Sequence, residues 1–161
     1  MHKETYTFYY QSFDNPEDLD AADAELLNVA RQSTSIAYAP YSRFRVSAAG
    51  RMENGEIIIG SNQENASFPA GICAERVLLA TASSLYPKTP IKAIAISYHQ
   101  ENGSDDHPIA PCGICRQSLL EYESITQSQI RLILAGKSGK ILIVPSASDL
   151  MPLAFTREEL L

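Results

Sequence analysis

All three cysteines of this 161-residue chain lie in two short motifs that could bind a metal ion. Cys73 begins a Cys-Ala-Glu-Arg segment, and Cys112 and Cys115 form a Pro-Cys-x-x-Cys motif. Structural zinc sites usually have four protein ligands, whereas catalytic zinc sites have three and leave one position for water. Three thiolates therefore indicate a hydrolytic zinc enzyme.

Two residues in the first cysteine motif, Glu75 and Arg76, could assist such a metal. Glu75 is at most about 7 Å from Cys73 along the backbone, so its carboxylate can reach a metal-bound water without being a ligand. We expect Glu75 to be the catalytic proton shuttle, and Arg76 to offset the charge of the thiolates by hydrogen bonding to sulfur. The ordinary alternatives are an acid that complements a helix dipole and a solvated cation.

The Cys-x-x-Cys pair alone is ambiguous, because redox dithiols and halves of zinc ribbons share it. The chain has no second pair that would complete a ribbon, and its third cysteine stands two residues before a glutamate. Both observations favour a catalytic metal site. A non-catalytic zinc protein or a redox protein remains as the alternative, in which Glu75 has no necessary part.

Composition restricts the partners and the compartment. The chain is 45% hydrophobic and 20% charged, with a net charge of -6 and no cluster of lysine or arginine. Duplex nucleic acid and anionic membranes are therefore poor candidate partners. No apolar run approaches the about 20 residues of a membrane helix, and the N-terminus lacks the apolar core of a signal peptide. We expect a cytoplasmic protein, because an odd number of cysteines fits a reducing compartment.

Hydrophobic patterning predicts one α/β domain with a mixed sheet, in which helices and strands are interspersed. Asn15 and Pro16 carry a helix-start signature, and this helix is expected to end before Pro40. Asn54 and Gly55 predict a hairpin turn. The expected strands cover 5–13, 45–53, 56–61, 91–98, 131–135 and 140–144, and the later helices cover 73–85, 112–122 and 148–154.

The chain resembles the zinc-dependent cytidine deaminases, specifically their short, homotetrameric branch whose first ligand is cysteine. Zinc deaminases share a His/Cys-x-Glu motif followed later by Pro-Cys-x-x-Cys, and this chain matches both. The similarity runs from about Ala37 to Leu160. It includes Tyr-Ala-Pro-Tyr-Ser-Arg-Phe at 38–44, Asn-Gln-Glu-Asn-Ala-Ser-Phe-Pro at 62–69 and Leu-Met-Pro-Leu-Ala-Phe at 150–155.

The resemblance implies a role for each matching residue. One zinc ion per subunit would be bound by Cys73, Cys112 and Cys115, with Glu75 as the proton shuttle. The remaining matched residues would contact the substrate. These are Asn62 and Glu64 at the ribose hydroxyls, Phe44 on the pyrimidine ring, the Ala74 amide and the Ala110 carbonyl at the base edge, and Phe155, offered to a neighbouring subunit's site.

The resemblance also implies a fold and an assembly. We expect a single three-layer α/β/α domain over residues 16–161, with a mixed five-stranded sheet. Residues 1–15 would form a strand-like extension, serving as an added edge strand or an oligomer contact. The assembly would be a homotetramer, or a dimer, with active sites shared between subunits.

The implied reaction is hydrolytic deamination of cytidine or deoxycytidine to the uridine analogue and ammonia, in pyrimidine salvage. Another aminopyrimidine nucleoside, such as blasticidin S, is an alternative substrate. The pair of Asn62 and Glu64 favours an unphosphorylated ribose, because a nucleotide would call for cations near the sugar. A base editor acting on RNA or DNA is disfavoured by the acidic charge.

Overall fold

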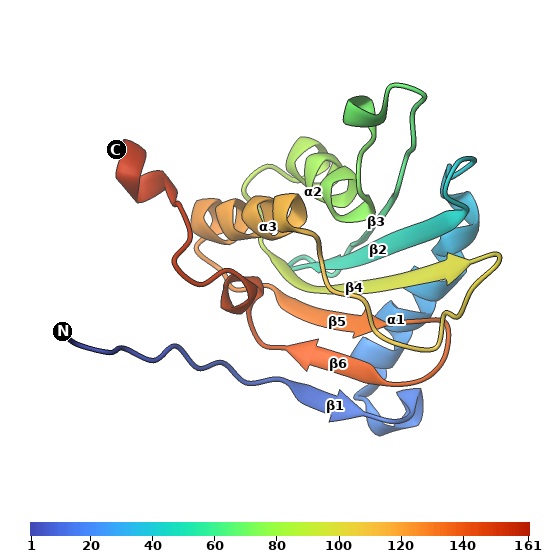
Figure 1. The fold of residues 1–161 in the computed structure, drawn as a ribbon, viewed down its shortest axis with the longest axis horizontal. Helices are drawn as coiled ribbons and strands as arrows, with labels where there is room; N and C mark the ends of the chain where they lie inside the picture. The colour runs from blue at the N-terminus through green and yellow to red at the C-terminus, as the bar shows by residue number, and fades with distance from the viewer.

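The computed structural model describes residues 1–161 and is built around one mixed sheet of six strands (Figure 1). The strand order is β1-β6-β5-β4-β2-β3. Only β4 and β5 are parallel, and a helix connects these two, as a crossover between parallel strands requires. The strands are β1 (Gln11–Phe13), β2 (Phe44–Met52), β3 (Ile57–Ser61), β4 (Ile91–Gln100), β5 (Arg131–Ala135) and β6 (Ile141–Val144).

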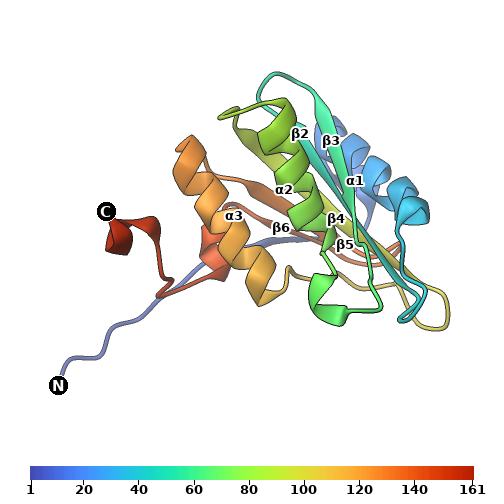
Figure 2. The same ribbon diagram turned by 90° about the horizontal axis from the view of Figure 1, so that it is seen from above.

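Helices cover both faces of the sheet, which confirms the expected three layers (Figure 2). Helix α1 (Ala21–Ser33) packs on one face, and α2 (Ala74–Leu85) and α3 (Gly113–Thr126) lie side by side on the other. The apolar residues accordingly form two cores, one beneath α1 and one beneath α2 and α3. None of these helices has the length and apolar character needed to cross a membrane.

The first helix begins later than predicted. Asp20 is its N-cap, and the Asp20 carboxylate accepts a hydrogen bond of 2.8 Å from the Asp23 amide. The segment after Asn15 forms only a short 3-10 turn over Pro16–Asp18, and Asn15 makes no side-chain cap. The prediction of a cap at Asn15 was wrong because a second capping residue follows five positions later and serves the longer helix.

The N-terminal strand is shorter than the predicted range 5–13. Strand β1 covers only Gln11–Phe13 and pairs antiparallel with Ile141–Ile143 of β6. This edge strand raises the number of strands to six, against the five expected for the core. Before Gln11 the chain leaves the sheet and extends away from the body (Figure 1). The predicted helix over 148–154 is likewise reduced to a 3-10 turn, Ala147–Leu150.

The predicted hairpin and both cysteine helices are confirmed. The hairpin joins β2 to β3, and Gly55 at its turn has φ +90°, a conformation that favours glycine. Helix α2 begins directly after Cys73, and α3 begins directly after Cys112. Both cysteine motifs therefore stand at helix N-termini on the same face of the sheet.

Gly60 in β3 allows α2 to lie directly against the sheet. A Cβ atom at Gly60 would stand 2.2 Å from the Ala74 carbonyl oxygen and 2.4 Å from the Leu78 amide nitrogen. These are backbone atoms of the first turns of α2, so they cannot move without shifting the helix. The absence of a side chain at Gly60 thus fixes the depth at which Cys73 is presented.

We predict that Gly60→Ala destabilises the protein by about 1–3 kcal/mol, because the added methyl group forces α2 away from β3. The matched control is Gly113→Ala, where a Cβ meets no atom within 4 Å. Denaturant unfolding measures both. Equal free energies of unfolding for Gly60→Ala and the wild type would show that the contact between α2 and β3 is not tight.

Candidate metal centre and active site

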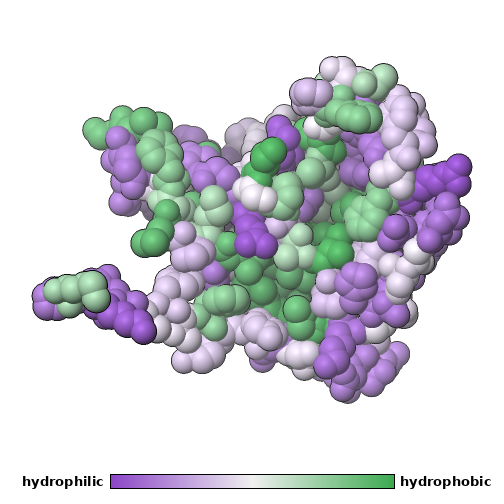
Figure 3. All heavy atoms as spheres, viewed as in Figure 1, coloured by the Kyte–Doolittle hydropathy of each residue, from purple (hydrophilic) through white to green (hydrophobic).

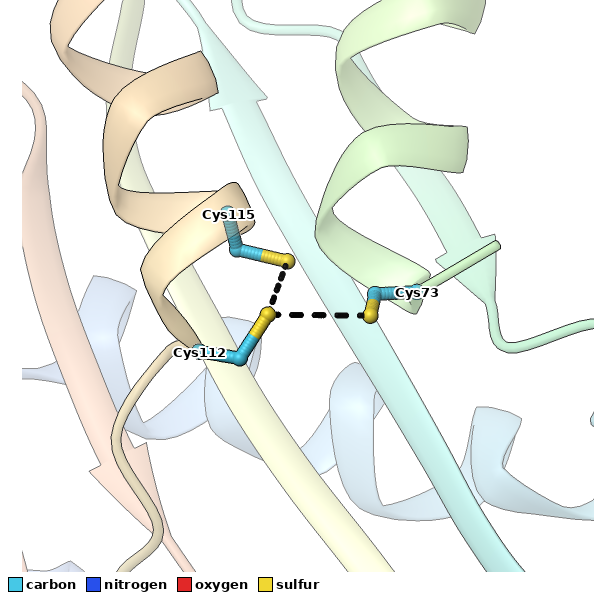
Figure 4. Close-up of side chains that lie close together, drawn as sticks. All are labelled: Cys73, Cys112 and Cys115. Atoms are coloured by element: carbon cyan, nitrogen blue, oxygen red, sulfur yellow. Dashed lines mark hydrogen bonds between the residues drawn. The ribbon is translucent and has the colours of Figure 1, made fainter. Parts of the chain in front are cut away.

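The three cysteines converge because α2 and α3 begin next to each other (Figure 4). Cys73 and Cys112 are the N-cap residues of the two helices, both with extended backbone conformations, and Cys115 lies one turn further into α3. The amides at a helix N-terminus are free of intrahelical partners, and the dipole favours negative charge there. This placement stabilises thiolates, the form in which cysteine binds a metal.

The spacing of the sulfur atoms fits one tetrahedral metal ion. The Cys73 and Cys112 Sγ atoms are 3.9 Å apart, those of Cys112 and Cys115 are 3.5 Å apart, and all three lie within 4.8 Å of one another. Zinc–sulfur bonds of about 2.3 Å in tetrahedral geometry place sulfur atoms about 3.8 Å apart. No disulfide joins them. Three converging thiols suit Zn²⁺, and a fourth cysteine or histidine is absent from the cluster.

The thiols differ in their tendency to ionise. The neighbouring Cys115 thiol, acting as a hydrogen-bond donor, lowers the pKa of Cys73 to about 6. The same interaction, together with burial, raises the pKa of Cys115. In the metal-free protein near neutral pH, Cys73 is therefore the thiolate and Cys115 keeps its proton. A metal ion that binds all three sulfur atoms must displace that proton.

Glu75 lies in the first turn of α2 and is only 5% exposed. Burial raises the pKa of its carboxyl group. A carboxylic acid whose pKa is raised toward neutrality can both accept and return a proton during one reaction cycle. Its position, two residues from Cys73 of the sulfur cluster, suits it to that role.

A pocket of about 550 Å³ opens beside Cys73. Its walls come from the turn that precedes β2 and from the long loop between β3 and α2. Cys73 is the only member of the sulfur cluster in its wall, so the pocket borders the cluster at Cys73. The lining residues are Tyr41, Ser42, Asn62, Gln63, Glu64, Asn65, Phe68, Gly71, Ile72 and Cys73.

The predicted ribose pair lies in this wall. Asn62 is held by strand β2, since its Oδ1 accepts from the Val46 amide at 2.8 Å and its Nδ2 donates to the Phe44 carbonyl at 2.9 Å. Glu64 accepts hydrogen bonds from the Tyr41 and Ser42 amides. Hydrogen bonding, chiefly with the Ser42 side chain, lowers the pKa of Glu64, so it is ionised and can accept from a hydroxyl group.

Phe44 is not part of that wall but stands at the start of β2 and stacks on Tyr98 of β4. The two ring centroids are 4.9 Å apart, and the planes are inclined by 20°. The hydroxyl group of Tyr98 in turn lies 3.1 Å from His107 Nδ1. Neither Tyr98 nor His107 was predicted to lie near the site. The available signal was the alternation of β4, which places Tyr98 on the face that carries α2 and α3.

The other predicted residues are spread around the cluster. Ala74 is fully buried as the first residue of α2, and Ala110 is exposed just before the Pro-Cys-x-x-Cys motif. The Arg76 side chain makes no hydrogen bond to sulfur, although its charge contributes to lowering the pKa of Cys73. Phe155 is 60% exposed in the C-terminal segment and takes no part in its own chain's pocket.

The chain is similar to known proteins over most of its length. The model of the cytidine and deoxycytidylate deaminase zinc-binding region matches residues 20–130. Cytidine deaminase of Halalkalibacterium halodurans is 37% identical over 135 residues, which are 84% of this chain and 95% of that protein. The cytidine deaminase of Sporosarcina psychrophila is 33% identical over 136 residues, 84% of this chain and 93% of that protein.

Solved structures share the fold. The crystal structure of cytidine deaminase from Burkholderia pseudomallei matches with a TM-score of 0.70 at 36% identity, and covers 81% of this chain and 97% of that one. That of cytidine deaminase from Mycobacterium tuberculosis gives a TM-score of 0.63 at 29% identity, with 86% and 98% covered.

We predict that the purified chain carries one zinc ion per subunit and that Cys115→Ser reduces zinc to background, because a hydroxyl group is a poor replacement for a thiolate. Ser118→Ala, one turn further along α3, is the control and keeps its zinc. Elemental analysis after gel filtration measures both. Undiminished zinc in Cys115→Ser would exclude Cys115 as a ligand.

We also predict that zinc binding at pH 7 releases at least one proton, because the raised pKa of Cys115 keeps this thiol protonated in the metal-free protein. Calorimetric titration in two buffers with different ionisation enthalpies measures the release. An observed enthalpy that is the same in both buffers would contradict this protonation state.

Proposed function

Because the chain belongs to the family of zinc-binding cytidine and deoxycytidylate deaminases, we propose that it hydrolyses cytidine and deoxycytidine to uridine and deoxyuridine, with release of ammonia. The observation that carries this proposal is the cluster of three sulfur atoms, with the buried carboxyl group of Glu75 beside it and a pocket whose wall includes Cys73. A redox dithiol has no use for that carboxyl group or for the third thiol.

Each residue of the site has a defined task in this reaction. Cys73, Cys112 and Cys115 would hold the zinc ion, which would lower the pKa of a bound water molecule. Glu75 would carry two protons in succession: the first passes from the attacking water to the ring nitrogen, and the second passes from the new C4 hydroxyl group to the amine, which leaves as the C–N bond breaks. The Glu75 carboxyl group thereby returns to its starting state, and water and the nucleoside become ammonia and the 4-oxo product.

Substrate orientation follows from the groups around the pocket. Glu64, as an ionised acceptor, and Asn62 bind the ribose hydroxyls, while Phe44 packs on the pyrimidine ring. The Ala74 amide and the Ala110 carbonyl bind the base edge. The pocket wall contains no lysine or arginine, which supports a nucleoside rather than a nucleotide as substrate.

The assembly that we propose is a homotetramer, or a dimer, in which Phe155 reaches a neighbouring subunit's site. Support comes from the C-terminal segment, where Leu153 and Phe155 are exposed. Both terminal segments project from the body on the same side (Figure 1). The space-filling view shows hydrophobic side chains in the middle of this face, between the projecting segments and the mainly hydrophilic opposite edge (Figure 3).

Residues 1–15 are proposed as an extension of the catalytic domain, 16–161, which supplies an edge strand and an oligomer contact. The odd number of cysteines supports a cytoplasmic location, and the proposed substrates suit a role in pyrimidine salvage. Arg76 is proposed to moderate the charge of the metal centre through its proximity to Cys73, rather than through a hydrogen bond.

Glu75→Gln tests the mechanism. The amide keeps the size of the side chain but cannot carry the proton, so kcat should fall at least about 10²–10⁴-fold while the zinc content stays at the wild-type level. Glu121→Gln on α3 is the control for loss of a helical carboxylate and should retain activity. Loss of the cytidine absorbance measures turnover, and near-normal turnover in Glu75→Gln would remove this residue from the mechanism.

A substrate panel tests specificity. Cytidine and deoxycytidine should be turned over with kcat/KM values at least about 100-fold above that for dCMP, because no cation in the pocket wall pairs with a phosphate. Blasticidin S belongs to the same panel. A preference for either dCMP or blasticidin S would overturn the assignment of the substrate.

A further inference from the structure

We propose that Tyr98 is a positioning residue for this site, which holds the Phe44 ring in place and links it to the loop that leads to Ala110 and Cys112. The inference rests on the proposed function, in which Phe44 contacts the base. Tyr98 touches neither the metal centre nor the pocket wall. Its effect on the substrate is therefore exerted through Phe44.

The stacking of Phe44 on Tyr98 follows from the register of β2 and β4. Val46 is paired with Tyr98, and Phe44 is paired with Gln100, so Phe44 and Tyr98 are diagonal neighbours on the same face. Phe44 is the first residue of β2 and follows Arg43, which has φ +56°. Tyr98 is the aromatic ring that stacks on Phe44.

Tyr98 itself is fixed by burial and by the contacts of its hydroxyl group. Its residue is 1% exposed, and its hydroxyl group donates to the Ser104 carbonyl at 3.2 Å. The edge of the His107 ring lies against the same hydroxyl group, with ring centroids 5.6 Å apart. Burial, together with the charges of Asp105 and Asp106, raises the pKa of Tyr98, so the hydroxyl group keeps its proton and can donate.

The loop that receives the hydroxyl group is anchored to the end of the sheet. The Asp105 carbonyl accepts from the Lys137 amide at 2.7 Å and from the Ser138 amide at 3.3 Å. The approach is so close that a Cβ at Gly136 would stand 2.1 Å from the Asp105 carbonyl oxygen. His99 Nδ1 adds a contact of 2.7 Å to the Asp105 carboxylate. The hydroxyl group of Tyr98 is thus bound to a loop that is itself held in place by hydrogen bonds.

This loop continues through His107 to Ala110 and then to Cys112 at the start of α3. The loop holds the hydroxyl group of Tyr98, and Tyr98 in turn holds the Phe44 ring that packs on the base. Loosening Tyr98 should weaken binding of the base in the ground state and in the transition state to a similar extent. Such a change raises KM and leaves kcat nearly unchanged.

A double-mutant cycle tests the inference. Tyr98→Leu should raise KM for cytidine about 3- to 10-fold, the range for loss of an aromatic pair, with kcat within about twofold and zinc content unchanged. In a Phe44→Leu background, the same Tyr98→Leu change should add nothing, because Tyr98 acts through Phe44. Tyr98→Phe keeps the ring but loses the hydroxyl group, and should give an intermediate KM.

Tyr122→Leu is the matched control. Tyr122 is also buried on this face, and its hydroxyl group donates to a loop carbonyl, that of Thr89, at 3.0 Å. This variant should lose stability without a change in KM. If Tyr98→Leu does not fold, Tyr98→Phe decides, since an unchanged KM in that variant overturns the link to the loop.

Two further outcomes separate this inference from the proposed function. If the wild type is active and the effects of Tyr98→Leu and Phe44→Leu on KM are additive, the positioning role is refuted and the proposed function is not. A zinc-loaded wild type that does not deaminate cytidine would refute the proposed function, and this inference with it.

Discussion

The convergence of two helix N-termini on one group of sulfur atoms is the interaction on which the rest of the site depends. Cys73 caps α2 and Cys112 caps α3, so the positive ends of both helix dipoles point at the thiolates. Negative charge on the sulfur atoms, which would attract the metal ion, is therefore stabilised in the metal-free protein. Glu75 is placed by the same turn of α2 that places Cys73, which couples the position of the proton carrier to that of the metal.

Packing far from the sulfur atoms maintains this convergence. Gly60 sets the depth of α2 on the sheet, and Arg116 fixes the start of α3 by donating from Nε to the Pro111 carbonyl at 2.8 Å. At the other end of α3, the buried Glu123 carboxylate accepts from the Ile130 and Ala147 amides. Both helices are thus held along their length, and the positions of the thiols do not rely on the metal alone.

The metal centre could be predicted from sequence because its residues are close in the chain and carry distinctive chemistry. The two cysteine motifs and the glutamate lie within short segments whose helical character is itself a local property. The stacking of Phe44 on Tyr98 was missed because it depends on the register between β2 and β4, two strands that are far apart in the sequence. The start of α1 was misplaced because Asn and Asp are both residue types that favour N-caps, and in the structure Asp20 rather than Asn15 caps α1.

X-ray absorption spectroscopy of the zinc-loaded protein tests the central claim most directly, because it counts the ligand atoms of the metal. If three thiolates and one solvent molecule bind the zinc ion, the spectrum should show three sulfur atoms at about 2.3 Å and one oxygen atom at about 2.0 Å from the zinc. Four sulfur atoms, as in a closed structural site, or a shell of nitrogen and oxygen without sulfur, would contradict the account.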